Sequence, residues 1–137
     1  MCIRDRIGHA VEVTYDYEHL LHGEAVSIGM VASTWMGVQA GLTDPELLNH
    51  QSALLRGLGL PIVIPLSLRE RYDVTILEKR IKQMLGKDKK RTPKGLVWIV
   101  PERLGSGICT THISSGVVGR CLRMLAVGID WCTRGGL

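Results

Sequence analysis

One stretch, residues 22–40 with the sequence HGEAVSIGMVASTWMGVQA, limits the possible folds of this 137-residue chain more than any other. Its pattern predicts one long helix, and Gly41 follows where a helix commonly ends. Apolar residues nearly surround the axis of this helix, so neighbouring elements must cover it on every side. Gly29 and Gly37 would let the backbones of those neighbours approach closely. We therefore expect a mainly α-helical fold with this helix at the centre of a bundle.

The rest of the chain contains the patterns of elements that would cover the central helix. Apolar residues at helical spacing predict further helices over about residues 7–15, 44–58, 74–85 and 116–127. Two short runs rich in β-branched residues predict a small β-hairpin near residues 96–112. One helical domain over residues 7–127 is therefore expected. Residues 1–6 are expected to be a non-native N-terminal scar, and residues 128–137 a tail that is disordered or non-native.

The helix predicted near residues 44–58 has the clearest end signals. Thr43 or Asp44 can cap its first turn, and Pro45 suits the first helical position. Glycines and a proline follow its last turn, as expected for a helix end. Five leucines are expected to form its buried stripe: Leu47, Leu48, Leu54, Leu55 and Leu58.

Composition excludes several classes of protein. The net charge of +4 is compatible with an anionic ligand, but aromatic residues make up only 4% of the chain and basic residues cluster only at residues 87–91, so nucleic-acid binding is not expected. No apolar run is long enough to cross a membrane, and no signal peptide is visible. The four cysteines form no CxxC pair, which favours free thiols in a reducing compartment. A cytoplasmic protein without a membrane partner is expected.

Two histidines and two carboxylates stand close together near the start of the chain. Glu12 follows His9 by three residues, and Glu24 follows His22 by two. Carboxylates at such spacings can orient an imidazole or share a metal ion with it. The alternative is that both histidines are ordinary residues of apolar helices. Two histidines alone are not a zinc motif, because zinc usually takes at least three protein ligands.

The basic run KDKKR, residues 87–91, is the second candidate site. Its lysines Lys89 and Lys90 can bind phosphate or carboxylate groups through charge-assisted hydrogen bonds. The alternative is that these charges complement the dipole at a helix C-terminus.

Five motifs in order, GHAVE, LLHGEAVSIGM, GLP, DKK and GLVWIVP, resemble 3-dehydroquinate synthases. The resemblance extends over roughly residues 7–105, and the HGEAVSIGM block is specific within the wider group of sugar-phosphate cyclases. Members of this family convert 3-deoxy-D-arabino-heptulosonate 7-phosphate to 3-dehydroquinate and phosphate in the shikimate pathway. They use NAD, bound by an N-terminal Rossmann-like domain, and a divalent metal, Zn²⁺ or Co²⁺. The resemblance thus implies a phosphate-eliminating lyase that acts on a small sugar phosphate, and a parent enzyme that is a homodimer.

The resemblance also implies roles for individual residues. His22 corresponds to a metal ligand, and His9 to a residue that binds the phosphate end of the substrate or relays protons. Lys89 and Lys90 correspond to lysines that contact the anionic groups of the substrate, and Lys89 is the preferred catalytic candidate. Where the family carries a second metal-binding histidine, this chain has Asp5. The third ligand, a glutamate, and the NAD-binding half have no counterpart here, so the isolated chain is expected to be inactive.

Two other functions are compatible with the sequence. The first is another sugar-phosphate cyclase or an iron-type polyol dehydrogenase, because these enzymes share the fold and similarly placed histidines. The second is a non-catalytic helical interaction domain, for which the histidines and lysines would not converge on one place.

Overall fold

The computed structural model describes residues 6–14, 20–65, 75, 78–80, 82–83, 91–92, 95–96, 98–103, 106–110 and 113–127. Its helices are α1 (Arg6–Thr14), α2 (His22–Gln39), α3 (Pro45–Gly57) and α6 (Ser115–Val127), and residues 75, 78–80 and 82–83 are also helical. Its strands are β1 (Arg91–Thr92), β2 (Gly95–Leu96), β3 (Trp98–Arg103) and β4 (Ser106–Thr110). The prediction of a mainly helical domain with a small hairpin is confirmed.

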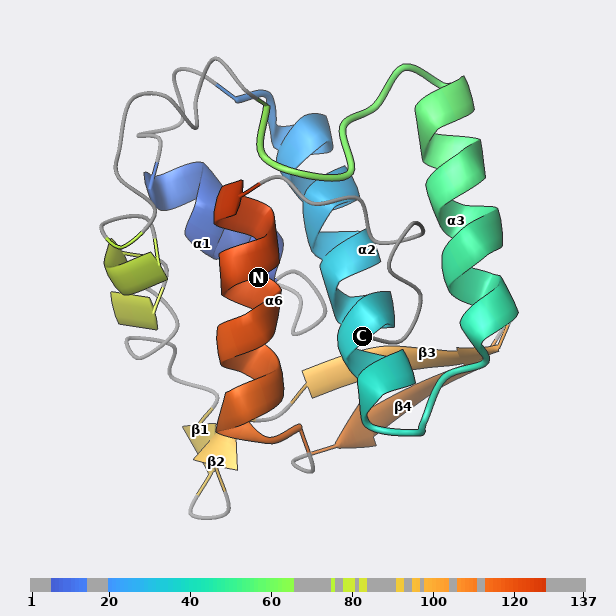
Figure 1. Ribbon diagram of the computed structural model, residues 1–137, viewed down its shortest axis with the longest axis vertical. Helices are drawn as coiled ribbons and strands as arrows, with labels where there is room; N and C mark the ends of the chain where they lie inside the picture. Colours follow the sequence, from blue (N-terminus) through green and yellow to red (C-terminus); the bar gives the residue numbers. More distant parts are fainter. Residues whose placement is uncertain are drawn as a thin grey trace.

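Helix α2 is the centre of the fold, as its apolar sequence predicted. It contacts α1, α3, α6 and β3, and in Figure 1 it runs between α6 on one side and α3 on the other. Its buried side chains point in all directions around the axis, and Ile28, Trp35 and Met36 are among the largest fully buried side chains. Burial of these side chains supplies much of the hydrophobic stabilisation of the domain.

Helices α1 and α2 pack with their backbones in direct contact. A Cβ atom on Gly8 would lie 2.7 Å from the carbonyl oxygen of Ala25, and one on Gly29 would lie 2.7 Å from the backbone nitrogen of Gly8. Both distances are too short for any side chain. The two glycines therefore allow a helix crossing that no other residue would permit at these positions.

The connection between α2 and α3 binds the β3–β4 hairpin. Gly41 ends α2 with a φ of 75°, and the Asp44 carboxylate caps α3 by accepting a hydrogen bond from the backbone N–H of Glu46 at 3.0 Å. Of the two predicted caps, Asp44 is therefore the one used. The Thr43 hydroxyl instead donates to the carbonyl oxygen of Pro101, and the Asp44 backbone N–H donates to that of Glu102 at 3.1 Å.

The prediction for the leucines of α3 is partly wrong. Leu48 and Leu55 are buried together with Ser52, but Leu54 and Leu58 are exposed. Among the helices in the described residues, α3 has its main contacts with α2, so only a narrow face of it is covered. Leu54 lies about a third of a turn around the helix from that face, and Leu58 follows the last residue of α3.

The predicted hairpin is present as β3 and β4, which pair antiparallel with Val100 opposite Ile108. It lies at the C-terminal end of α2 (Figure 1), where Val100 is fully buried. The short antiparallel pair β1–β2 was not predicted. Residues 1–5 and 128–137 lie outside the described residues, so the expectations for a scar and a tail stay predictions. Within the described residues no helix is both long enough and apolar enough to span a bilayer.

Cys121 on α6 is fully buried, with its Sγ 4.0 Å from the carbonyl oxygen of Ala32. Burial raises the pKa of this thiol far above its ordinary value, because the thiolate would lose its hydration. Since the thiolate is the reactive form, we expect N-ethylmaleimide to leave Cys121 unmodified in the folded protein and to label it fully in urea. Peptide mass spectrometry after a short pulse of the reagent would measure this. Rapid labelling of Cys121 under native conditions would contradict its burial between α6 and α2.

Candidate functional site

The candidate site centres on a hydrogen bond between His22 and Glu12. The Nδ1 atom of His22 lies 3.0 Å from Oε2 of Glu12. The two side chains differ sharply in environment, since the imidazole is 77% exposed and the Glu12 side chain only 9% exposed. The pair thus joins a carboxylate at the edge of the core to an imidazole on the surface.

The packing of α1 against α2 brings these two residues together. Gly8 contacts α2 beside Ala25 and Gly29, and Glu12 lies one helical turn further along α1. Because α2 runs past α1 in the opposite direction, this turn of α1 reaches the first residue of α2, which is His22. The close crossing at the glycines therefore sets the position of the pair.

Glu24 does not orient either histidine. Its Oε1 accepts a hydrogen bond from the backbone N–H of Leu21 at 2.9 Å, which is half of a capping box at the start of α2. The sequence interpretation, which grouped each histidine with the carboxylate that follows it, is therefore wrong for His22. Its carboxylate partner is Glu12, ten residues earlier and on another helix.

His9 lies on α1 three residues before Glu12, and its side chain is exposed. Residues three apart are neighbours on a helix surface, so His9 flanks the His22–Glu12 pair on the solvent side of α1. Lys89 and Lys90 lie outside the described residues, and their predicted role as substrate-binding residues stays a prediction.

The chemistry of the pair fits one ligand of a metal ion. Histidines that bind metals commonly donate their other ring N–H to a carboxylate, and the exposed His22 ring bonded to Glu12 has this arrangement. Among the residues that the structure describes, no group of three histidine, cysteine, aspartate or glutamate side chains is placed to hold a metal. The described residues therefore do not form a complete metal site, and the role of His22 as a metal ligand stays a prediction.

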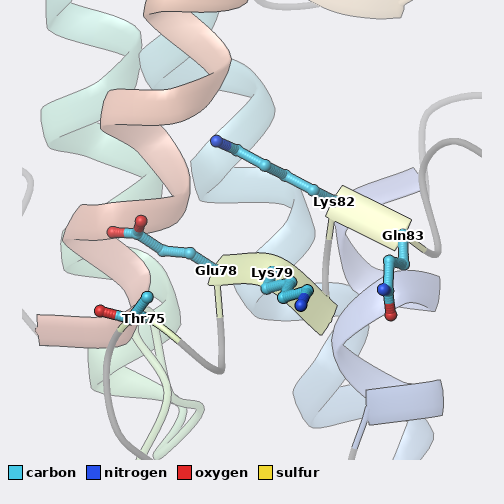
Figure 2. A pocket seen from close by; sticks show the side chains of 5 residues that line it. All are labelled: Thr75, Glu78, Lys79, Lys82 and Gln83. Carbon is cyan, nitrogen blue, oxygen red and sulfur yellow. The ribbon is translucent and has the colours of Figure 1, made fainter.

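A separate hollow of about 430 Å³ is lined by Thr75, Glu78, Lys79, Lys82 and Gln83. Figure 2 shows Glu78 pointing toward α6, where Nη1 of Arg123 lies 3.7 Å from its Oε1. Lys79 and Lys82 are exposed. The lining contains neither His9 nor His22, so the hollow is separate from the histidine site.

The chain is similar to 3-dehydroquinate synthases and to a 2-epi-valiolone synthase. The family described as 3-dehydroquinate synthase C-terminal matches residues 6–91. A 3-dehydroquinate synthase of Nostoc punctiforme is 32% identical over 119 residues, which cover 85% of this chain and 30% of the relative. A 3-dehydroquinate synthase of a Geobacter species is 35% identical over 100 residues, 73% of this chain and 25% of the relative. A 2-epi-valiolone synthase of Actinosynnema mirum is 32% identical over 115 residues, 84% of this chain and 29% of the relative.

This chain therefore spans between 25% and 30% of the length of these three relatives. The family match covers more than half of the chain and includes both histidines, Glu12 and the two candidate lysines. The resemblance seen in the motifs is thus confirmed over residues 6–91. On this evidence, the chain belongs to the 3-dehydroquinate synthase C-terminal family.

Proposed function

We propose that this chain is the helical, metal- and substrate-binding part of a 3-dehydroquinate synthase, which converts 3-deoxy-D-arabino-heptulosonate 7-phosphate to 3-dehydroquinate and phosphate. The observation that carries the proposal is the His22–Glu12 pair inside the segment that matches the family. A non-catalytic interaction domain would have no need for a surface imidazole that is hydrogen-bonded to a nearly buried carboxylate. The relatives' additional length would contain the NAD-binding part.

Each candidate residue has a distinct role in this proposal. His22 would be one ligand of a divalent metal, Zn²⁺ or Co²⁺, which when bound polarises a substrate hydroxyl as a Lewis acid. His9, on the solvent side of the pair, would bind the phosphate end of the substrate or relay a proton. Lys89 would pair with an anionic group of the substrate, since a lysine is a compact charge with several donors, and Lys90 is its neighbour in the same run.

The proposal is tested with a chimera, because the isolated chain spans only part of its relatives and is expected to be inactive. Residues 6–127 would replace the matching segment of the Geobacter 3-dehydroquinate synthase, and phosphate release from the heptulosonate phosphate would be followed with NAD and zinc present. We expect turnover by the chimera and its loss in His22→Ala. The control is His50→Ala, an exposed histidine on α3 that should leave turnover unchanged.

Two results would contradict the proposal: a folded chimera without turnover, or a His22→Ala variant as active as the parent. Turnover by the 137-residue chain alone would contradict the expectation that it is inactive.

The match to a 2-epi-valiolone synthase supports a second candidate, a related cyclase that acts on a different sugar phosphate. The same chimera, assayed with the substrate of that enzyme, distinguishes the two. Faster turnover of that substrate than of the heptulosonate phosphate would favour the second candidate.

A further inference from the structure

We propose that Glu12 is a positioning residue that holds the His22 ring in one tautomer and one orientation, with Nε2 free to bind a metal ion. This inference rests on the proposed role of His22 as a ligand. It concerns a residue that acts through His22 and has no contact of its own with the metal.

The first step of the argument is the direction of the hydrogen bond. An ionised carboxylate can only accept hydrogen bonds, so the 3.0 Å contact requires the proton to be on Nδ1 of His22. When the imidazole is neutral, Nε2 then carries a lone pair and no proton. A lone pair is what a metal ion needs from a histidine.

The second step is that Glu12 is held in place and cannot follow the ring. Its side chain is almost buried on α1, whereas the His22 ring, at the first position of α2, is mostly exposed. An exposed side chain at a helix start would otherwise sample several rotamers. The hydrogen bond to an anchored carboxylate selects one of them, which lowers the entropy cost of binding a ligand.

The third step is that the backbone fixes the anchor itself. Gly8 and Gly29 hold α1 and α2 at a separation that no larger residue allows, and this crossing determines how far Glu12 lies from His22. A nearly buried carboxylate without a hydrogen-bond partner would destabilise the fold, and the hydrogen bond to His22 offsets this cost.

The test is long-range ¹H–¹⁵N correlation NMR of the metal-free 137-residue chain, at a pH where the His22 ring is neutral. The His22 signals are assigned by their loss in His22→Ala. We expect the parent to carry the proton on Nδ1. In Glu12→Gln, whose side-chain amide can donate as well as accept, this preference should be lost and the Nε2–H form should appear. The matched control is Glu24→Gln, which removes the same charge two residues from His22 and should leave the tautomer unchanged.

Zinc alone is then titrated into the metal-free Geobacter chimera and its Glu12→Gln and Glu24→Gln variants, because the isolated chain has only part of a ligand set, and the His22 ring signals are followed. We expect the apparent Kd for zinc to rise about 10- to 100-fold in Glu12→Gln, the usual effect of losing a carboxylate partner of a metal-binding histidine. Glu24→Gln should change it little.

The outcomes separate this inference from the proposed function. A parent spectrum with the proton on Nε2 would overturn the inference without need of any variant, and so would a tautomer that is the same in Glu12→Gln. If the tautomer depends on Glu12 but zinc leaves the His22 signals of the chimera unmoved, the positioning role holds and the proposed ligand role of His22 fails.

Discussion

Trp35→Ala is expected to lower the free energy of unfolding by about 3–5 kcal/mol. Trp35 lies in the C-terminal half of α2, the helix that contacts α1, α3, α6 and β3, and it is 1% exposed. Its ring also contacts α6, where the Arg120 guanidinium lies 5.9 Å from the ring centroid. Removing the indole leaves a cavity that rigid neighbours on several sides cannot fill. Domains have a total stability of about 5–15 kcal/mol, so this loss is a large fraction of it.

Urea denaturation followed by far-UV circular dichroism would measure the effect of Trp35→Ala. Leu54→Ala on α3 is the control, because it also truncates a large apolar side chain on a helix, but at a position that is mostly exposed. That control should change the free energy of unfolding by no more than about 0.5 kcal/mol. Equal effects of the two substitutions would show that α2 is not the centre of the core.

Gly29→Ala is expected to lower the free energy of unfolding by about 1–3 kcal/mol, although alanine favours helices more than glycine does. The added methyl group would meet the backbone nitrogen and Cα of Gly8, at 2.7 and 3.0 Å, and backbone atoms cannot rotate away as a side chain can. The helices must therefore separate. This would also lengthen the His22–Glu12 hydrogen bond, so the preference for the proton on Nδ1 should weaken in the same variant.

The matched control is Gly119→Ala, within α6, where a methyl group would meet no atom within 4 Å. There only the helix propensity changes, and stability should rise by up to about 1 kcal/mol. Opposite signs for two glycine-to-alanine changes, both within helices, are the expected result in thermal or urea denaturation. A stabilising Gly29→Ala would contradict the close crossing of α1 and α2.

The central position of α2 could be predicted from the sequence, because a helix that is apolar on all sides must be covered by other elements on all sides. The face of α3 could not be predicted with the same accuracy. Leu54 and Leu58 satisfy the same helical spacing as Leu48 and Leu55, and only the position of α2 decides which pair is buried. The two-residue strands β1 and β2 are too short to produce a pattern in the sequence.

The candidate site, too, could be predicted from the sequence only in part. The sequence identified His9, His22 and Glu12 as candidates, and the motif resemblance gave His22 its expected role. Spacing along the chain could not show that Glu12 pairs with His22, because that contact depends on how two helices cross. The signal that bears on it is the pair of glycines, Gly8 and Gly29, each of which is a position for close backbone approach.

The order in which the chain is synthesised gives the central position of α2 a further consequence. The ribosome completes α2 before β3 and α6, which cover two of its sides and follow some sixty to ninety residues later, as the Thr43–Pro101 and Ala32–Cys121 contacts show. Until those segments emerge, the sides of this strongly apolar helix that contact β3 and α6 stay uncovered. A nascent chain of this kind has a long interval in which it depends on chaperones to avoid aggregation.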